Sequence, residues 1–599
     1  MTQPSYAIGI DLGTTNSALA FTPLGDSNPS VELLPIPQMT TATSIEKRAL
    51  LPSFIYLPTE AELEAGTLTV TERDKAVGVV GHFARAQSAA VPTRTVAAAK
   101  SWLCHSRVDR HQPILPWQAP EDVKQLSPIT ASALYLAHLA ATWNAAFPEH
   151  SFVEQYVTLT VPASFDASAR DLTREAARLA GFPKDFILLE EPQAALYAWL
   201  ATQGERWRDA LHVGDLILVC DVGGGTTDFT LISVEDRGGE LELNRVAVGN
   251  HILVGGDNMD LALAFMAQAL FKEQGHELDA WQSVSLWHAC RAAKEALLAP
   301  DGPAQHPVTI LGRGSKVIGG SLSVELSRDQ VASTLIDGFL PRCAITDKPM
   351  KRAVSGFKQL GLPYESDTGI TRHLARFLTE HAPIGNEAGA RRPSHLIFNG
   401  GVFKAAALKE RMRELLTDWF PGHEAPATLA GSEDLDYAVA RGAAYYGRIK
   451  QEGGMRIRGG TARAYYIGIE TVGLAIPGAP RPLHALCVVP HGMEEGTSIE
   501  VPSEEIGLVV GEPVHFRFFS SASRTEDTPG TLLTHWSDEE LMETDSLETE
   551  LKATEQTDGG YIPVKIETHV TELGVLECWC VSTTSAERWK LEFSVRDPA

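Results

Sequence analysis

Two segments far apart in the chain carry the same pattern of apolar and polar positions. Residues 7–12 (AIGIDL) and 16–21 (NSALAF) are apolar runs separated by a short polar turn, which is typical of a β-hairpin. The same order of apolar run, aspartate, glycines, threonines and apolar run returns at residues 216–232. A repeated hairpin predicts two similar lobes with a cleft between them.

Between and beyond these hairpins, runs with strand character alternate with runs of helical periodicity. Residues 51–57 and 156–161 are predicted strands, and residues 80–87, 129–147 and 170–180 are predicted helices. Alternation of this kind is typical of an α/β domain.

The pattern changes after Ile467 to short alternating runs separated by glycine and proline. Examples are residues 498–501, 514–519 and 562–570. Because alternation of apolar and polar residues indicates strands with one buried face, this part of the chain is predicted to be an all-β domain.

Length and composition restrict the class of protein. With 599 residues the chain is too long for a single core, and 44% hydrophobic and 21% charged residues are typical of a soluble multidomain protein. A formal net charge of −25 argues against binding of nucleic acid or anionic membranes. Residues 1–6 lead directly into the first strand and no apolar run is long enough to span a bilayer, so we expect a cytoplasmic location.

The cysteines and histidines do not form metal-binding patterns. The 7 cysteines are scattered and include no Cys-x-x-Cys pair, so neither a disulfide framework nor a zinc ribbon is predicted. Cys578 and Cys580 lie on one face of a predicted strand, where core packing is a more common role than metal binding. The 19 histidines show no metal-ligand spacing, and we predict no protein-ligated transition metal.

The turn of the first hairpin has the residue types that hold phosphate. Gly13 lets the backbone approach a phosphate closely, the Thr14 and Thr15 hydroxyls supply donors, and Asp11 at the strand end can hold a hydrated cation. A single turn of this kind is more often an ordinary hairpin turn. Two of them can clamp one nucleotide, with Asp11 and Asp221 facing each other across the phosphates.

The sequences of the two hairpins, IGIDLGTTNS and DVGGGTTDF, resemble those of the Hsp70 chaperone family within the actin, sugar-kinase and Hsp70 superfamily. The resemblance implies a two-lobed, actin-like (duplicated ribonuclease H-like) α/β ATPase domain at residues 1–448 and a linker at 449–462. It also implies an all-β sandwich, similar to a substrate-binding domain, at residues 463–599. Because the chain stops at Ala599, the helical lid usual in the family is expected to be missing.

The resemblance further implies ATP or ADP with Mg²⁺ in the cleft. Lys100 matches the family lysine that reaches the phosphates, and Glu191, just before Pro192, matches the glutamate that holds the metal's water shell and orients the attacking water. Alternation along the strand predicts that the neighbouring Glu190 is a solvated charge. The expected catalytic residues are Lys100, Glu191, Thr226 and Asp228, and the residues expected to hold Mg²⁺ through water are Asp11 and Asp221.

The chain departs from the family where the family binds adenosine. Arg291 stands in place of the ribose-binding acid and Glu295 reverses the following positive charge, which leaves the affinity for adenosine open. Phe403 or Lys404 is the candidate to stack on the base. The residues expected to contact the nucleotide are Gly13, Thr14, Thr15, Asn16, Gly223, Gly224, Gly225, Thr227, Gly255, Gly256, Lys294, Gly400, Gly401, Lys404 and Asp436.

Communication between the two predicted domains depends on a segment that also differs from the family. The residues that match Pro162 and Arg170 relay nucleotide state to the substrate domain in the family, and these two inherit that role by resemblance. The family's hydrophobic linker is replaced by residues 457–461 (IRGGT). A glycine-rich polar segment is expected to act as a flexible tether, and the alternative is that Tyr465 and Tyr466 dock instead.

The sequence therefore predicts an ATP-hydrolysing, Hsp70-like chaperone that binds unfolded polypeptide clients. A nucleotide-regulated binding or scaffold protein with little turnover is the main alternative, and the β-rich C-terminal part disfavours a small-molecule kinase of the same superfamily. The family also implies J-domain and nucleotide-exchange co-chaperones as partners. Ile187, Glu190 and Gln193 differ from the usual residues where the J-domain is received.

Overall fold

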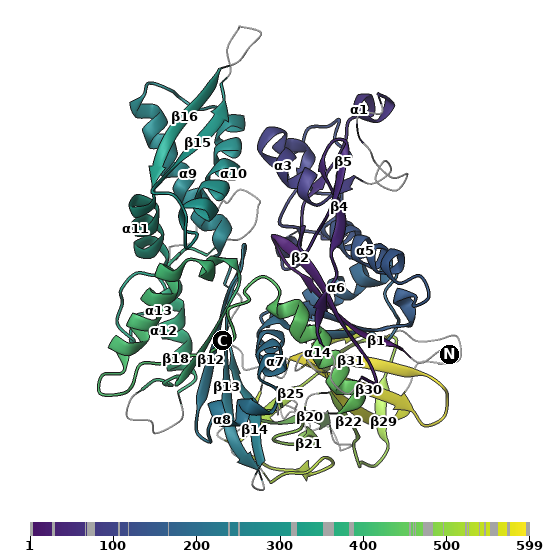
Figure 1. Cartoon of the computed structure of the whole chain (residues 1–599). Helices are drawn as coiled ribbons and strands as arrows, with labels where there is room; N and C mark the ends of the chain where they lie inside the picture. Colours follow the sequence, from purple (N-terminus) through teal and green to yellow (C-terminus); the bar gives the residue numbers. More distant parts are fainter. Residues whose placement is uncertain are drawn as a thin grey trace, which may run out of the picture. The chain divides into compact units, whose positions relative to one another are not determined.

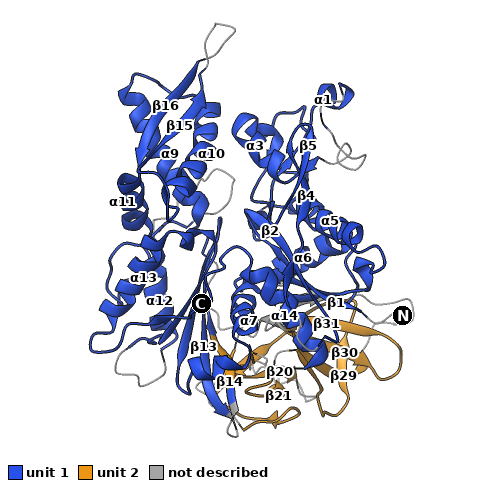
Figure 2. Cartoon of the chain, viewed as in Figure 1, with its two compact units in different colours: residues 1–241, 247–455 blue, residues 242–246, 456–599 orange. Residues whose placement is uncertain are grey.

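The computed structural model forms two compact units (Figure 2). One unit comprises Met1–Leu241 and Ala247–Met455, and the other comprises Glu242–Val246 and Arg456–Ala599. The structure describes residues 4–594 except for 27–29, 66–67, 69–77, 106–107, 118, 166, 238–239, 250–251, 313–319, 351–364, 383–388, 454–456, 459–460, 462, 471–482, 495, 522–523, 525, 538–539, 544–546, 552–560 and 572–574.

The first sheet of the larger unit is built around the N-terminal hairpin (Figure 1). Strand β1 (Tyr6–Leu12) pairs antiparallel with β2 (Asn16–Pro23) and parallel with β10 (Tyr156–Val161). Strand β11 (Ile187–Glu190) continues the parallel part, and β3 (Glu32–Leu33) lies on the other side of β2. The continuous burial of β10 and β11 is typical of parallel strands that are covered on both faces.

The second sheet repeats this topology around the second hairpin. Strand β12 (Leu216–Val222) pairs antiparallel with β13 (Thr227–Arg237) and parallel with β17 (His395–Asn399), which in turn pairs parallel with β18 (Ala427–Thr428). The predicted repeat of the hairpin and the α/β character of this unit are confirmed.

Helix α14 (Ala438–Glu452) packs directly on the first sheet and on α7 (Glu191–Gln203), because two glycines leave room for the backbone. A Cβ atom on Gly9 of β1 would lie 2.2 Å from the carbonyl oxygen of Ala440, and one on Gly442 would lie 1.7 Å from the carbonyl oxygen of Ala194. Only glycine allows these approaches. The packing holds the start of α7, where Glu191 lies.

Helix α5 (Pro128–Ala146) begins at a cap that can be recognised in the sequence. The helix, predicted at residues 129–147, follows Ser127, whose hydroxyl accepts a hydrogen bond from the Thr130 backbone at 3.0 Å. In the described part of the chain, no helix combines the length and apolar character needed to cross a membrane. The other helices of this unit are α1 (Glu60–Glu64), α3 (His82–Ala90), α4 (Ala99–Leu103), α6 (Ala167–Leu179), α8 (Trp207–Ala210), α9 (Gly256–Glu273), α10 (Ala280–Leu297), α11 (Arg328–Phe339), α12 (Ile370–Glu380) and α13 (Ala406–Trp419).

Further strands complete this unit. They are β4 (Ile36–Thr41), β5 (Ser44–Arg48), β6 (Leu51–Pro52), β7 (Ile55–Tyr56), β8 (Val79–Val80), β9 (Thr95–Val96), β14 (Glu240–Val248), β15 (Gln305–Leu311) and β16 (Ser321–Ser327). Residues 242–246 of β14 belong to the second unit.

The second unit is rich in antiparallel strands, as predicted. One five-stranded sheet has the order β26-β21-β20-β25-β27, and in the other β29 also pairs with β23 beside the path β22-β29-β30-β31. The strands are β20 (Ala464–Glu470), β21 (Leu483–Val489), β22 (Thr497–Glu500), β23 (Ile506–Val509), β24 (Pro513–Phe516), β25 (Phe518–Ser521), β26 (Leu532–Leu533), β27 (Met542–Glu543), β28 (Leu547–Glu550), β29 (Tyr561–Val570), β30 (Val575–Ser582) and β31 (Arg588–Ser594).

Side chains from both sheets share one hydrophobic core. Tyr465 and Phe518 from the first sheet belong to the same cluster as Val564, Cys578 and Cys580 from the second. The prediction that the two cysteines pack in a core is therefore confirmed. Burial raises the pKa of the Cys580 thiol to about 12, which keeps it neutral at physiological pH.

The segment at residues 457–461 is only partly described, and its first two residues are not a flexible tether. Ile457 and Arg458 form β19, which pairs in parallel with β14, and Ile457 lies opposite Leu243. The side chain of Ile457 is buried. A β-branched residue beside the edge of a strand gains both backbone hydrogen bonds and burial of its side chain. The prediction of a tether considered the glycines of the segment and overlooked this preference of Ile457. Gly459 and Gly460 lie outside the described residues.

The alternative role predicted for the two tyrosines is wrong. Tyr465 stacks on Phe518 with 5.5 Å between ring centroids. Tyr466 is fully buried, and its hydroxyl donates a 2.6 Å hydrogen bond to Asp527. Both rings are used within the core of their own unit, so neither is free to dock elsewhere.

Candidate functional site

A cavity in the larger unit brings the two glycine–threonine turns together. Most of the residues predicted from the sequence line it. These are Asp11, Gly13, Thr14, Thr15, Asn16, Lys100, Glu191, Asp221, Gly223, Gly224, Thr226, Gly256, Lys294, Gly400, Gly401, Lys404 and Asp436.

The two turns approach each other so closely that glycine is required. A Cβ atom on Gly224 would lie 2.0 Å from the hydroxyl oxygen of Thr15, and one on Gly225 would lie 2.7 Å from the hydroxyl oxygen of Ser101. Within the first turn, a Cβ atom on Gly13 would lie 2.1 Å from the carbonyl oxygen of Asn16. The glycines therefore shape a narrow gap lined by backbone and hydroxyl groups.

A third turn closes on the second hairpin from the start of α9. The Gly256 amide donates to the Gly223 carbonyl at 3.0 Å, and the Asp257 amide donates to the Gly224 carbonyl at 2.7 Å. The Thr227 hydroxyl donates to the Val254 carbonyl at 2.8 Å. Backbone contacts thus hold the two turns as one wall of the cavity.

Three of the predicted nucleotide contacts lie behind this wall instead of lining the cavity. Thr227 is fully buried and its hydroxyl is already bonded to Val254. Gly225 packs against Ser101, and a Cβ atom on Gly255 would lie 2.6 Å from the Gly224 oxygen. These three residues support the wall from behind. Along a turn, some residues face the cavity and others pack against the protein behind it, and the sequence does not distinguish the two.

Lys100 is a buried residue of the site and not a surface charge. It lies on the short helix α4 and forms an ion pair with Glu191, the first residue of α7. Burial opposes the charge, but the carboxylates of Glu191 and Asp11 raise the pKa of Lys100. The lysine is therefore held charged at the centre of the cavity.

The two predicted metal carboxylates come from equivalent positions near the ends of β1 and β12. Asp11 accepts a 3.3 Å hydrogen bond from Thr160, and Asp221 accepts a 2.8 Å hydrogen bond from the side-chain amide of Asn399. Burial, followed by the charge of Glu191, raises the pKa of both aspartates to about 7. Mutual repulsion of this kind favours binding of a cation between them.

Asp228 lies next to this group but does not line the cavity. It is paired with Asp221 across the second hairpin and is buried. Burial and, less strongly, the charge of Glu191 raise the pKa of Asp228 to about 7, against a hydrogen bond from Ser164. Its Oδ1 atom has no hydrogen-bond partner among the described residues. In the described part of the chain, no three His, Cys, Asp or Glu side chains are arranged to hold a metal ion directly.

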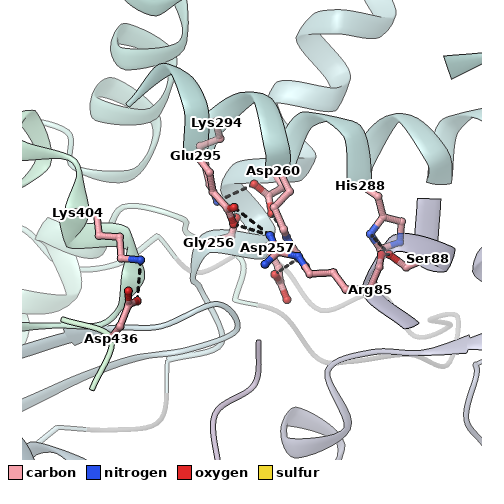
Figure 3. A network of polar contacts seen from close by, with 11 residues as sticks. Arg85, Ser88, Gly256, Asp257, Asp260, His288, Lys294, Glu295, Lys404 and Asp436 are labelled. Carbon is pink, nitrogen blue, oxygen red and sulfur yellow. Dashed lines mark hydrogen bonds and ion pairs between the residues drawn. The ribbon is translucent and has the colours of Figure 1, made fainter. Parts of the chain in front are cut away.

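Helix α10 supplies a wall of charged side chains that are paired within the protein (Figure 3). Arg291 is buried, donates to Asp260 at 2.8 Å and forms an ion pair with Asp257. Lys294 lies 2.6 Å from the other oxygen of Asp260 and donates to the Gly256 carbonyl at 3.0 Å. The charge at position 291 is therefore balanced by two aspartates of α9 that sequence reasoning did not single out.

Glu295, the next charged residue of α10, pairs with α3. Both of its oxygens accept hydrogen bonds from Arg85 at 2.9 Å (Figure 3). Nearer the start of α10, Ser285 donates to the carbonyl of Ala89 in α3 at 2.8 Å. The charge reversal noted in the sequence is thus matched by an arginine on a neighbouring helix.

Of the two candidates to stack on a base, only Lys404 lines the cavity. Lys404 lies 2.7 Å from Asp436 (Figure 3). The expectation for Phe403 is wrong, because its ring is fully buried against Phe398 with 4.6 Å between centroids. The residue is drawn into the core because it lies in a short helical turn directly after a buried strand.

The prediction that Glu190 is a solvated charge is also wrong. Glu190 is fully buried and lies 3.7 Å from the guanidinium of Arg170, which also donates to the Ala163 carbonyl at 3.2 Å. Alternation separates solvent from core only in sheets with one exposed face, whereas both faces of this parallel pair are covered. Arg170 lies inside α6 and not at its start.

Asn399 is the polar residue that the sequence reasoning missed at the centre of the site. It ends β17, next to Asp221 in the parallel register. Polar residues at the carboxyl ends of parallel strands are where α/β folds place chemistry. Applied to the end of β17, that rule would have led to Asn399.

Part of the chain is similar in sequence to known proteins. A family model described as Hsp70 protein matches residues 69–357. The chaperone protein HscA of Enterobacter sp. (strain 638) is 33% identical over 274 residues, which cover 44% of this chain and 37% of the relative.

Two further relatives give the same picture. The HscA homologs of Bordetella petrii and Aeromonas hydrophila are each 31% identical, over 306 and 347 residues, covering 49% and 56% of this chain. The matches span 42% and 48% of those two relatives, so less than half of their length. Residues 69–357, slightly less than half of the chain, thus match the Hsp70 family, and the chain is similar to the HscA chaperones at about 30% identity over about half of its length.

Proposed function

We propose that this protein is an ATP-dependent, Hsp70-like chaperone that hydrolyses ATP to ADP and phosphate and binds unfolded polypeptide segments. The observation that carries the proposal is the cavity in which two glycine–threonine turns surround a buried Lys100–Glu191 pair and the carboxylates of Asp11 and Asp221. The similarity to the Hsp70 family supports ATPase activity in general, and the particular reaction and substrates of this chain are our inference.

The residues of the cavity fit a nucleotide with Mg²⁺. Because Gly224 has no Cβ atom, the second turn lies directly against Thr15, and both turns line the cavity. Backbone amides and hydroxyls in this arrangement suit a bound phosphate. Three carboxylates against one lysine leave an excess of negative charge. Asp11 and Asp221 would hold a hydrated Mg²⁺, which prefers oxygen ligands and keeps several of its waters. The ion would neutralise charge on the phosphates.

The protein's own groups have distinct roles in the proposed reaction. Lys100 places a fixed positive charge beside the transferring phosphate. Glu191, held by Lys100, and the hydroxyl of Thr226 orient the attacking water. Asp228, which does not line the cavity, supports the position of the Thr226 hydroxyl. Catalysis in such a site comes mainly from positioning and charge stabilisation.

Single-turnover ATP hydrolysis tests this assignment. We expect Lys100→Ala and Glu191→Ala to lower the rate roughly 10²-fold or more with little change in ATP affinity, because each removes a preorganised group at the developing charge. Lys272→Ala, which removes an exposed lysine from α9, is the matched control and should hydrolyse ATP at the parental rate. Parental rates in both site variants would show that the assignment is wrong.

The second unit is the proposed polypeptide-binding part. Two antiparallel sheets that share one core support a β-sandwich at residues 463–599, and the repeated sheets of the larger unit support an actin-like, two-lobed ATPase domain at residues 1–448. An extended peptide would be held by strand-like hydrogen bonds. We further propose a cytoplasmic location.

One observation favours a second candidate, a nucleotide-regulated binding protein with little turnover. The charged residues of α10 are paired with protein groups, which leaves few of them to hold the nucleoside tightly. The same single-turnover measurement separates the two candidates, since the second requires nucleotide binding without a measurable hydrolytic step.

A further inference from the structure

We infer that this site selects its nucleotide through the phosphates and Mg²⁺ and accepts different bases with similar affinity. The substrate class would then be nucleoside triphosphates in general, of which ATP is one. The inference rests on the proposed function of the cavity as a nucleotide site.

The first step concerns where the buried polar groups of the cavity lie. Lys100 and Glu191 are paired and largely buried, and Asp221 is buried with its amide partner Asn399. The backbone of the two turns is fixed by contacts that leave no room for a Cβ atom. Desolvated, immobile groups of this kind discriminate strongly between ligands, and here all of them surround the proposed phosphate position.

The second step concerns α10, which forms the next part of the wall. The Arg291 guanidinium is shared between Asp257 and Asp260, and Lys294 contacts Asp260 and the Gly256 carbonyl (Figure 3). These interactions satisfy the charges inside the protein. Arg291 therefore holds α9 and α10 together in this wall, and its charge is not available to pair with a base or a ribose.

The third step concerns the outer part of the cavity. Its charged groups are Lys404 and Asp436, which pair with each other, and Glu295, which pairs with Arg85 of α3. The side chains of Lys404 and Glu295 are 54% and 53% exposed. Ion pairs in contact with water are worth little and can rearrange. The remaining side chains that line the cavity away from the phosphate turns are apolar: Leu50, Val402, Leu435 and Val439.

These three steps predict a weak dependence of affinity on the base. A wrong base is rejected by roughly 10⁴- to 10⁵-fold only where it leaves a desolvated polar group unpaired, whereas an apolar wall distinguishes ligands of similar size far less. Here a wrong base would face apolar side chains and two solvated ion pairs. Each base can stack on the apolar wall, and water can replace any missing hydrogen bond.

Calorimetric titration of the full chain with ADP, GDP, CDP and UDP in the presence of Mg²⁺ tests the inference without interference from hydrolysis. We expect the four dissociation constants to agree within about 10-fold, in keeping with an apolar wall. A larger spread would overturn the inference while leaving the proposed nucleotide site intact. If none of the four diphosphates binds, the proposed function fails and the inference fails with it.

Two variants show which end of the cavity determines affinity. Asp221→Ala should weaken all four diphosphates by a common factor, since it acts on the phosphate and Mg²⁺ end. Lys404→Ala should leave the ratios among the four dissociation constants unchanged to within about 3-fold, because an exposed pair contributes little. If Lys404→Ala changes the affinity for only one of the four diphosphates, Lys404 discriminates between bases and the inference is wrong.

Discussion

The site contains more acidic groups than one lysine can balance. Asp221 and Asp228 are buried near Glu191, and Asp11 lines the same cavity. Lys100 is the buried cation that pairs with Glu191 in this group. Such a cluster is strained without a bound cation, because each carboxylate repels the next in a medium that screens poorly. This strain makes the protein's stability depend on pH and on Mg²⁺.

A pH dependence follows from the raised pKa values. Asp228 has a folded-state pKa of about 7 against an ordinary value of 3.8, so the protonated form favours the folded state. Its stabilising contribution is complete below about pH 4 and is lost as the pH rises through about 7. We therefore expect the Tm of the nucleotide-free protein to fall between pH 5 and pH 8, and to fall less in Asp228→Asn.

Thermal unfolding at several pH values, without and with Mg²⁺-ADP, measures this effect. Asp209→Asn, which changes an exposed aspartate of α8, is the control and should follow the parental curve. An identical pH dependence in Asp228→Asn and the parent would contradict the explanation. Bound Mg²⁺-ADP should reduce the loss at high pH, because the cation stabilises the ionised carboxylates.

At the level of elements, the contact between α14 and α7 decides how firmly Glu191 is held. A Cβ atom on Gly442 would collide with the Ala194 carbonyl oxygen at 1.7 Å. Gly338, inside α11, has no atom within 4 Å of the corresponding position. The two helical glycines therefore make a matched pair that separates backbone packing from helix propensity.

We expect Gly442→Ala to destabilise the protein by at least about 1–3 kcal/mol, because overpacking forces α14 away from α7. Gly338→Ala should be neutral or stabilising by about 0.5–1 kcal/mol, as alanine is the better helix former. Urea unfolding of both variants measures the difference. Equal stability changes would mean that the close approach of α14 and α7 does not matter.

For the whole molecule, the open question is how strongly nucleotide binding is linked to polypeptide binding. In the segment at 457–461, only Ile457 supplies a buried apolar side chain among the described residues, and burying one such side chain contributes roughly 1.5–3 kcal/mol. Glycines at 459 and 460 add none. A linker of several apolar residues could bias one arrangement of the molecule much more strongly.

We therefore expect ATP to change the affinity for an unfolded polypeptide by less than roughly 5-fold, the lower end of typical allosteric coupling. Titration of the full chain with a labelled, permanently unfolded polypeptide, in ATP and in ADP, measures this ratio. Replacing Gly459 and Gly460 with leucine should increase it. A large ratio in the unmodified chain would show that other contacts carry the coupling.

The sequence by itself determined the features that are formed by residues close together in the chain. The two hairpins, the alternation of strands and helices in the first domain and the strands after Ile467 follow from runs of neighbouring residues. Their turns need glycine and threonine at set spacings, and a β-hairpin brings together residues that are already close in the chain. These patterns predicted the turn residues and the two aspartates that line the cavity. The resemblance to the Hsp70 family predicted other lining residues, such as Lys100 and Lys294.

What only the tertiary structure decided were the partners of single charged and aromatic residues. The exposure of Glu190 depends on Arg170, the role of Arg291 depends on Asp257 and Asp260, and Phe403 is buried because β17 directs it into the core. Each of these outcomes depends on which surfaces are covered by elements distant in sequence. A residue's own type and its neighbours do not contain that information, since burial and charge pairing are properties of the packed molecule.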